Sequence, residues 1–203
     1  MNIQTAVQKA QIYLKKKNIK TPFLDCQILM SEVIKKEKEF IIFNFDKEIS
    51  NKSLEYFNKL IHQRARGEPI AYLVKKKYFW KYQFSVNRDV LIPRPDTEVL
   101  IEEVLKLTKN KDNLNLLDVG VGSGCILISI LKDKKNFYGT GIDISKKSLD
   151  TCKINGENLG VINRLKLYKS DIDNFHFRKY DLIISNPPYI KKSKLKYLEK
   201  DVI

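Results

Sequence analysis

The sequence predicts an α/β protein in which a small all-α domain precedes a parallel β-sheet. Through residues 2–66, apolar residues recur at helical spacing. From Leu114 onward, short apolar runs alternate with helical segments. The expected strands are 114–119, 137–143, 164–168 and 180–185, and the expected helices between them are 125–133 and 146–158. Strands and helices that alternate in this way favour a parallel sheet with crossover helices.

The helical N-terminal part is expected to form a small bundle over residues 1–67. Pro22 is placed to open its second helix, because proline suits the first helical turn. Ser50 is a suitable N-cap for a third long helix, which should end at Gly67. The bundle holds no glycine loop or polar cluster typical of chemistry, so we expect it to recognise or dock a substrate.

Residues 68–95 are interpreted as a β-hairpin linker. Aromatic and β-branched residues cluster at 78–86. The prolines within 92–95 then exclude a helix, because each restricts the residue before it. Asp96 or Thr97 is expected to cap a helix that opens the third region, 96–203.

We expect a soluble cytoplasmic protein from the composition and the N-terminal sequence. The 203 residues, 43% of them hydrophobic, suffice for one large domain or a small one plus part of another. No apolar stretch approaches the roughly 20 residues that span a bilayer, and the N-terminus lacks the pattern of a secretory signal. The three cysteines (Cys26, Cys125 and Cys152) are far apart, which predicts reduced thiols and no metal site.

The formal charge of +14 is compatible with a nucleic-acid partner. However, lysine greatly outnumbers arginine and is spread along the whole chain. Runs such as 15–17 and 75–77 are therefore expected to be solvated faces. The charge still favours acidic partners, through a long-range attraction that salt weakens.

A glycine loop follows the first expected strand. Gly120, Gly122 and Gly124 form G-x-G-x-G, which allows a ligand to approach the backbone closely. A dinucleotide fingerprint would need glycine at 125, where Cys125 stands, although looser variants leave NAD open. The plain alternative is a tight strand-to-helix turn.

Acidic residues follow the later strands. Asp143 is placed to accept both ribose hydroxyls of an adenosine, or else to cap a helix, a task that Ser145 could also perform. Asp171 is positioned near an adenine amino group unless it only forms a turn, and Ile172 could pack on the adenine face. Asp118 is expected to organise the glycine loop.

Asn186-Pro187-Pro188-Tyr189 follows the last expected strand. A planar nitrogen is a poor nucleophile because its lone pair is delocalised. The Asn186 side-chain carbonyl and the Pro187 carbonyl can accept hydrogen bonds from such an NH₂ group, and the prolines hold these acceptors rigid. Tyr189 can cover the flat face of the substrate. A strand-ending turn is the alternative, but this motif together with the glycine loop is typical of methyltransferases that use S-adenosyl-L-methionine.

With these motifs the chain resembles the bacterial release-factor glutamine N5-methyltransferases. Matching segments are 66–73, 78–80, 91–98, the glycine loop and 186–189. The resemblance implies a Rossmann-like class I methyltransferase domain behind the helical domain and the hairpin. It also implies methylation of the glutamine in the Gly-Gly-Gln motif of peptide chain release factors. We expect the protein to be a monomer.

The positions of these residues after the strands, together with the resemblance, give the expected site residues. Cofactor contacts are expected from Gly120, Val121, Gly122, Ser123, Gly124, Asp143, Asp171, Ile172 and Asn186, with Val121 and Ser123 contributing backbone only. Asn186 and Pro187 are the expected catalytic residues, and Asn186, Pro187, Pro188 and Tyr189 should hold the substrate glutamine. The family often has an aromatic residue where Ile172 stands, so weaker adenine stacking is expected.

Two alternatives remain. Nucleic-acid N6-adenine or N2-guanine methyltransferases share Asn-Pro-Pro-Tyr, often acting on a flipped base. The other alternative is an inactive truncated remnant. Members of the family continue beyond the position of Ile203, so we expect a C-terminally truncated sheet with an unpaired edge. That expectation includes low stability and reduced or absent activity.

Overall fold

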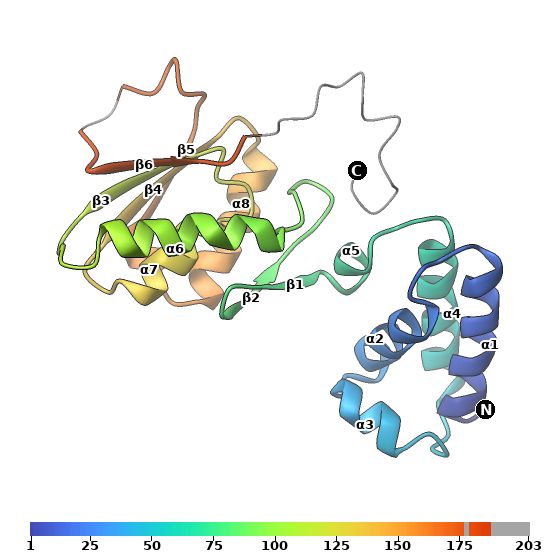
Figure 1. The fold of residues 1–203 in the computed structure, drawn as a ribbon. Helices are drawn as coiled ribbons and strands as arrows, with labels where there is room; N and C mark the ends of the chain where they lie inside the picture. Colours follow the sequence, from blue (N-terminus) through green and yellow to red (C-terminus); the bar gives the residue numbers. More distant parts are fainter. Residues whose placement is uncertain (177–178, 188–203) are drawn as a thin grey trace. The chain divides into compact units, whose positions relative to one another are not determined.

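The computed structural model describes residues 1–176 and 179–187, which form two compact units (Figure 1). The first unit contains Met1–Val74, and the second begins at Lys75. Within the described residues, no helix combines the length and apolar character that crossing a membrane requires.

The described part of the first unit, Met1–Val74, is built from helices. Its helices are α1 (Ile3–Lys16), α2 (Pro22–Ile34), α3 (Lys38–Phe43), α4 (Asn51–Ala65) and α5 (Ile70–Val74). As predicted, Pro22 opens α2 and the Ser50 side chain caps α4 by accepting a hydrogen bond from the Ser53 amide. The sequence pattern did not predict α3 and α5, because such short helices contain too few turns for a helical repeat to stand out. Helix α5 lies within the range expected to be the hairpin linker.

A buried ion pair ties α4 to α2 inside this unit. Arg64 Nε donates to Asp25 Oδ2 at 2.7 Å, and both side chains are almost fully buried. Thr21 Oγ1 donates to the other carboxylate oxygen at 2.9 Å. The surrounding core is apolar, with Leu14, Leu29, Met30, Ile41 and Phe57 among its fully buried side chains. Buried charges require this kind of pairing, so the pair constrains how the two helices meet.

The second unit begins with an antiparallel hairpin of β1 (Lys76–Phe79) and β2 (Tyr82–Ser85). Its turn is held by two carboxylates. Asp133 accepts hydrogen bonds from the Trp80 ring, the Lys81 ammonium and the Tyr82 hydroxyl. Glu98 accepts from the Trp80 backbone amide at 2.7 Å. The hairpin is thus anchored to the helices that carry Asp133 and Glu98.

Among the described residues, four parallel strands form the main sheet. They are β3 (Asn115–Val119), β4 (Tyr138–Asp143), β5 (Leu165–Lys169) and β6 (Leu182–Ser185), in the order β5-β4-β3-β6. The helices are η1 (Pro95–Thr97), α6 (Glu98–Leu107), α7 (Cys125–Asp133), α8 (Lys146–Asn158) and η2 (Ile162–Arg164). The predicted alternation of strands and helices is confirmed, and α7 and α8 have the predicted bounds.

Helices α6, α7 and α8 lie along one face of this sheet (Figure 1). Their apolar faces and that face of the sheet enclose the larger core of the unit. Successive residues of a strand point to opposite faces. Accordingly, Leu116 belongs to this core, whereas Leu117 packs with Ile142 and Phe175 in a smaller cluster.

The strand order reverses between β3 and β6, so the carboxyl ends of these two strands form a topological switch point. From β3 the chain proceeds outward to β4 and β5, then returns to the opposite side of β3 for β6. In open α/β sheets, ligands bind in the crevice where the strand order reverses in this way. The glycine loop and Asn186 directly follow these two strands.

Candidate active site at the carboxyl edge of the sheet

The glycine loop leaves open space beside its backbone. Gly120 and Gly122 have φ of +76° and +54°. Among the described residues, a Cβ atom at Gly120 would meet no atom within 4 Å, and one at Gly122 would meet only a backbone oxygen at 3.9 Å. At Gly124, with φ +79°, a Cβ would lie 2.5 Å from Cys152 Sγ and 2.6 Å from Ile128 Cδ1. The first two glycines therefore keep room for a ligand, and the third allows α7 to pack closely on α8.

Asp143 joins the glycine loop to the end of β4. Its Oδ2 accepts a hydrogen bond from the Gly122 amide at 3.0 Å, and its Oδ1 accepts from the Ser145 amide at 2.8 Å. Ser145 is the N-cap of α8, because its side chain accepts from the Ser148 amide. Each carboxylate oxygen has a further lone pair, so Asp143 retains the capacity to accept hydroxyl groups of a ligand.

The side chains of Val121 and Ser123 point into the protein. Val121 is 5% exposed and packs so closely on Gly141 that a Cβ there would lie 2.8 Å from Val121 Cγ2. Ser123 is 3% exposed. The loop consequently presents backbone atoms at these two positions.

Asp118 is a buried carboxyl group at the end of β3. It is 1% exposed, and its Oδ2 has no hydrogen-bond partner within the described part of the chain. The pKa of Asp118 is raised to about 7, mainly by burial and in smaller part by the negative charge of Asp143, although a hydrogen bond from the Leu127 amide acts in the opposite direction. An unpartnered buried acceptor under an open glycine loop suits a ligand that carries positive charge. S-adenosyl-L-methionine, with an ammonium group, a sulfonium and ribose hydroxyls, fits this set of groups.

The segment after β5 lies beside β4, because the Ser170 amide donates to the Asp143 carbonyl at 3.2 Å. Asp171 forms a local turn: its carboxylate accepts from the backbone amide and the side chain of Asn174. Ile172 is 49% exposed, and Ile144, directly after Asp143, is 72% exposed. Sequence reasoning did not single out Ile144, although an apolar residue directly after a strand-ending acid was a visible signal.

Asn186 directly follows β6 and lies at the same edge of the sheet. Ser185 pairs with Val119 in the sheet, and its Oγ donates to the Val119 carbonyl at 3.0 Å. Asn186 is half-buried, and its Nδ2 donates to Thr97 Oγ1 at 3.3 Å. Thr97 was expected only as a helix cap, but it makes no such hydrogen bond through its side chain.

Two residues of the motif, Pro188 and Tyr189, lie outside the described residues. Pro187 is exposed. The remaining predicted positions meet along one edge of the sheet: the glycine loop after β3, Asp143 after β4, the 171–172 segment after β5 and Asn186 after β6.

Comparison with known proteins identifies the family. Residues 5–74 match the PrmC N-terminal domain, and residues 95–201 match the methyltransferase small domain. The release factor glutamine methyltransferase of Buchnera aphidicola subsp. Acyrthosiphon pisum is 36% identical over 202 residues, which cover 100% of this chain and 72% of that protein. The enzyme of the same name from Clostridium acetobutylicum is 37% identical over 205 residues, with the same coverage.

The chain belongs to the release factor glutamine methyltransferase family. It is therefore a methyltransferase, and S-adenosyl-L-methionine is its cofactor. A solved S-adenosyl-L-methionine-dependent methyltransferase from Geobacter sulfurreducens, in complex with S-adenosyl-L-homocysteine, is 25% identical. That match covers 45% of this chain and 36% of the other, with a TM-score of 0.39.

Proposed function

We propose that the protein transfers a methyl group from S-adenosyl-L-methionine to N5 of the glutamine in the Gly-Gly-Gln motif of peptide chain release factors. The adjacency of the glycine loop and Asn186 carries this proposal. Val119 leads into the loop and its partner Ser185 leads into Asn186, on neighbouring parallel strands. A methyl donor at the loop and a planar amide at Asn186 then share one edge of the sheet.

The cofactor is held by residues of three strand ends. The loop backbone at Gly120 and Gly122 leaves room for it, Asp143 accepts its ribose hydroxyls, and Asp118 Oδ2 balances its ammonium charge. Asp171 and Ile172 lie near the adenine, and exposed Ile144 adds a further apolar contact. The bound cofactor supplies an electrophilic methyl group on a sulfonium leaving group.

The substrate amide is positioned by Asn186 and Pro187. Both offer carbonyl oxygens that accept hydrogen bonds from the glutamine NH₂, which aims the nitrogen at the methyl group. Thr97 holds Nδ2 of the Asn186 side chain, so that Oδ1 is the atom turned to the substrate. In this proposal, Pro188 and Tyr189 complete the substrate site. The rate enhancement comes mainly from positioning and electrostatics.

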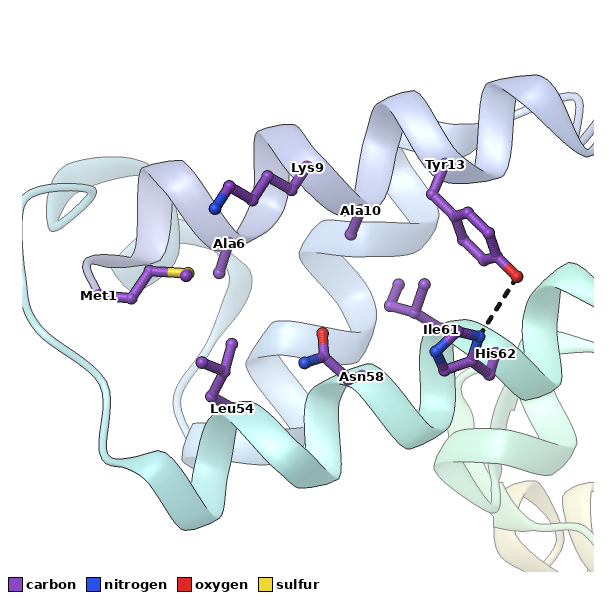
Figure 2. Close-up of a pocket in the computed structure, with 9 residues that line it drawn as sticks. All are labelled: Met1, Ala6, Lys9, Ala10, Tyr13, Leu54, Asn58, Ile61 and His62. Carbon is purple, nitrogen blue, oxygen red and sulfur yellow. Dashed lines mark hydrogen bonds between the residues drawn. The ribbon is translucent and has the colours of Figure 1, made fainter.

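The helical unit recognises the release factor in this proposal. A hollow of about 330 Å³ lies between α1 and α4 (Figure 2). Tyr13 and His62 are hydrogen-bonded at its edge, at 3.2 Å between the hydroxyl and Nδ1, and Lys9 also lines it. These side chains can hydrogen-bond acceptor groups of a protein partner. We place the enzyme in the cytoplasm, where translation occurs, as a monomer.

Methyl transfer from labelled S-adenosyl-L-methionine to purified release factor tests the proposal. A release factor with Gln→Ala in the Gly-Gly-Gln motif is the substrate control, and tRNA and DNA run beside it. We expect label on the intact factor alone, abolished by Asn186→Ala and retained by Asn158→Ala, which changes an exposed asparagine of α8. Equal label on the Gln→Ala factor, or label only on nucleic acid, would refute the assignment.

A further inference from the structure

We infer that Asn155 is a positioning residue that couples the β1–β2 hairpin to the cofactor loop. This inference rests on the proposed cofactor site. Asn155 lies in α8 and is 1% exposed. Its side chain contacts two segments distant in sequence, Ser85 at the end of β2 and Ser123 within the glycine loop.

The amide of Asn155 uses its carbonyl and its NH₂ group together. Oδ1 accepts from the Ser85 backbone amide at 2.7 Å, and Nδ2 donates to the Ser85 carbonyl at 3.0 Å. Nδ2 also donates to the Ser123 carbonyl at 2.8 Å. The two bonds to Ser85 determine which way the amide faces. Its second N–H is thereby directed at the loop.

The hydrogen bond to the Ser123 carbonyl restrains the loop backbone between two glycines. Ser123 stands between two glycines of positive φ, which lack the side chains that limit backbone rotation. The peptide unit that joins Ser123 to Gly124 is planar, so its C=O and N–H turn together. Its C=O accepts from Asn155, and its N–H donates to the Val121 carbonyl at 2.8 Å. Held at both ends, this peptide cannot flip without breaking a hydrogen bond.

The hairpin has other anchors that do not involve Asn155. Its turn is fixed by Asp133 and Glu98, as described above. After β2, Asn87 Nδ2 donates to Thr151 Oγ1 at 3.0 Å, and the Ser148 hydroxyl donates to the Asp89 carbonyl at 3.1 Å. Loss of the Asn155 amide therefore leaves the hairpin docked on α8 while it releases the loop.

The coupling should be reciprocal. If the hairpin helps to hold the loop in the conformation that binds cofactor, then bound cofactor must stabilise the hairpin contact by the same free energy. This gives Asn155 two measurable signatures: cofactor affinity and protection of the Ser85 amide.

Asn155→Asp tests the first signature. A carboxylate can still accept from the Ser85 amide, but it cannot donate to the carbonyls of Ser85 and Ser123. Asn158→Asp is the matched control, because it makes the same charge change at an exposed position of the same helix. We expect Asn155→Asp to raise the KM for S-adenosyl-L-methionine about tenfold, the scale of a lost buried hydrogen bond. At saturating cofactor, kcat should stay within about twofold of wild type. Wild-type KM in Asn155→Asp, or a fall in kcat alone, would overturn the inference.

Hydrogen exchange of the unmutated chain tests the second signature and does not depend on a variant that folds. Adding S-adenosyl-L-homocysteine should slow exchange of the Ser85 amide as well as of the loop amides. Slower exchange of the loop amides without any change at the Ser85 amide would support the proposed cofactor site but refute the coupling to the hairpin. If no binding occurred at all, the proposed cofactor site would be wrong, and the inference would fail with it.

Discussion

Alanine substitutions at Gly120, Gly124 and Gly160 distinguish three effects of an added Cβ atom. These effects are backbone strain, overpacking of the core and obstruction of the ligand site. Gly120 and Gly160 have φ of +76° and +68°, and a Cβ at either would meet no atom of the described part of the chain within 4 Å. Gly124 has a similar φ of +79°, but its Cβ would lie 2.5 Å from Cys152 Sγ and 2.6 Å from Ile128 Cδ1. Gly160 follows α8, outside the glycine loop.

The expected losses of stability differ accordingly. A left-handed conformation costs a residue with a Cβ about 1–2 kcal/mol, so Gly120→Ala and Gly160→Ala should each destabilise the second unit by that amount. Overpacking of a core adds about 1–3 kcal/mol, which brings the loss for Gly124→Ala to about 2–5 kcal/mol. Domains are stable by only about 5–15 kcal/mol, so this last variant should unfold at visibly lower denaturant.

Trp80 provides the assay. It is the only tryptophan of the chain and lies in the hairpin of the second unit, with its ring nitrogen bonded to Asp133. Guanidinium titration followed by its fluorescence therefore reports on the unit that carries all three glycines. Equal destabilisation by the three variants would refute the packing argument at Gly124. Cofactor titration should show weakened binding for Gly120→Ala and unchanged binding for Gly160→Ala; equal weakening in both would contradict the proposed position of the cofactor.

Three further outcomes are expected. Asp25→Ala removes the buried carboxylate that accepts from Arg64 Nε and should destabilise the helical unit by about 3–5 kcal/mol in a circular dichroism melt; a loss no larger than that of an exposed ion pair would contradict this. Burial raises the pKa of Asp118 from 3.8 to about 7, so the native state holds this proton longer than the unfolded chain does. The stability that the Asp118 carboxyl group contributes is full below about pH 4 and is lost as pH rises toward 7. In denaturant titrations at several pH values, the free energy of unfolding should therefore fall less steeply with pH for Asp118→Asn than for the wild type. Parallel curves for the two proteins would disprove this linkage. Thr97→Val removes the hydroxyl acceptor that orients the Asn186 side chain, so kcat should fall about threefold to tenfold. Thr97→Ser restores the hydroxyl and should restore kcat. An unaltered kcat in Thr97→Val would exclude an orienting role for Thr97.

Local signals in the sequence predicted the longer helices, the sheet strands and the position of the candidate site, but not the short helices α3 and α5. Apolar runs and helical repeats predicted the four parallel strands and the bounds of α7 and α8. Pro22 and Ser50 marked two helix starts because their effects act within a single turn. Gly120 and Asn186 could be placed on one edge of the sheet in advance, since each follows a strand and parallel strands all end on the same side.

Only the tertiary structure decided which of these groups touch one another. Asn155 bonds to Ser85 and Ser123, and Thr97 lies 89 residues before its partner Asn186. No periodicity or short motif encodes such pairs, because they depend on how β6 returns beside β3 and how α8 packs against the hairpin. The open space at Gly120 and the burial of Asp118 have the same origin: both are properties of neighbours that the fold brings from distant parts of the chain.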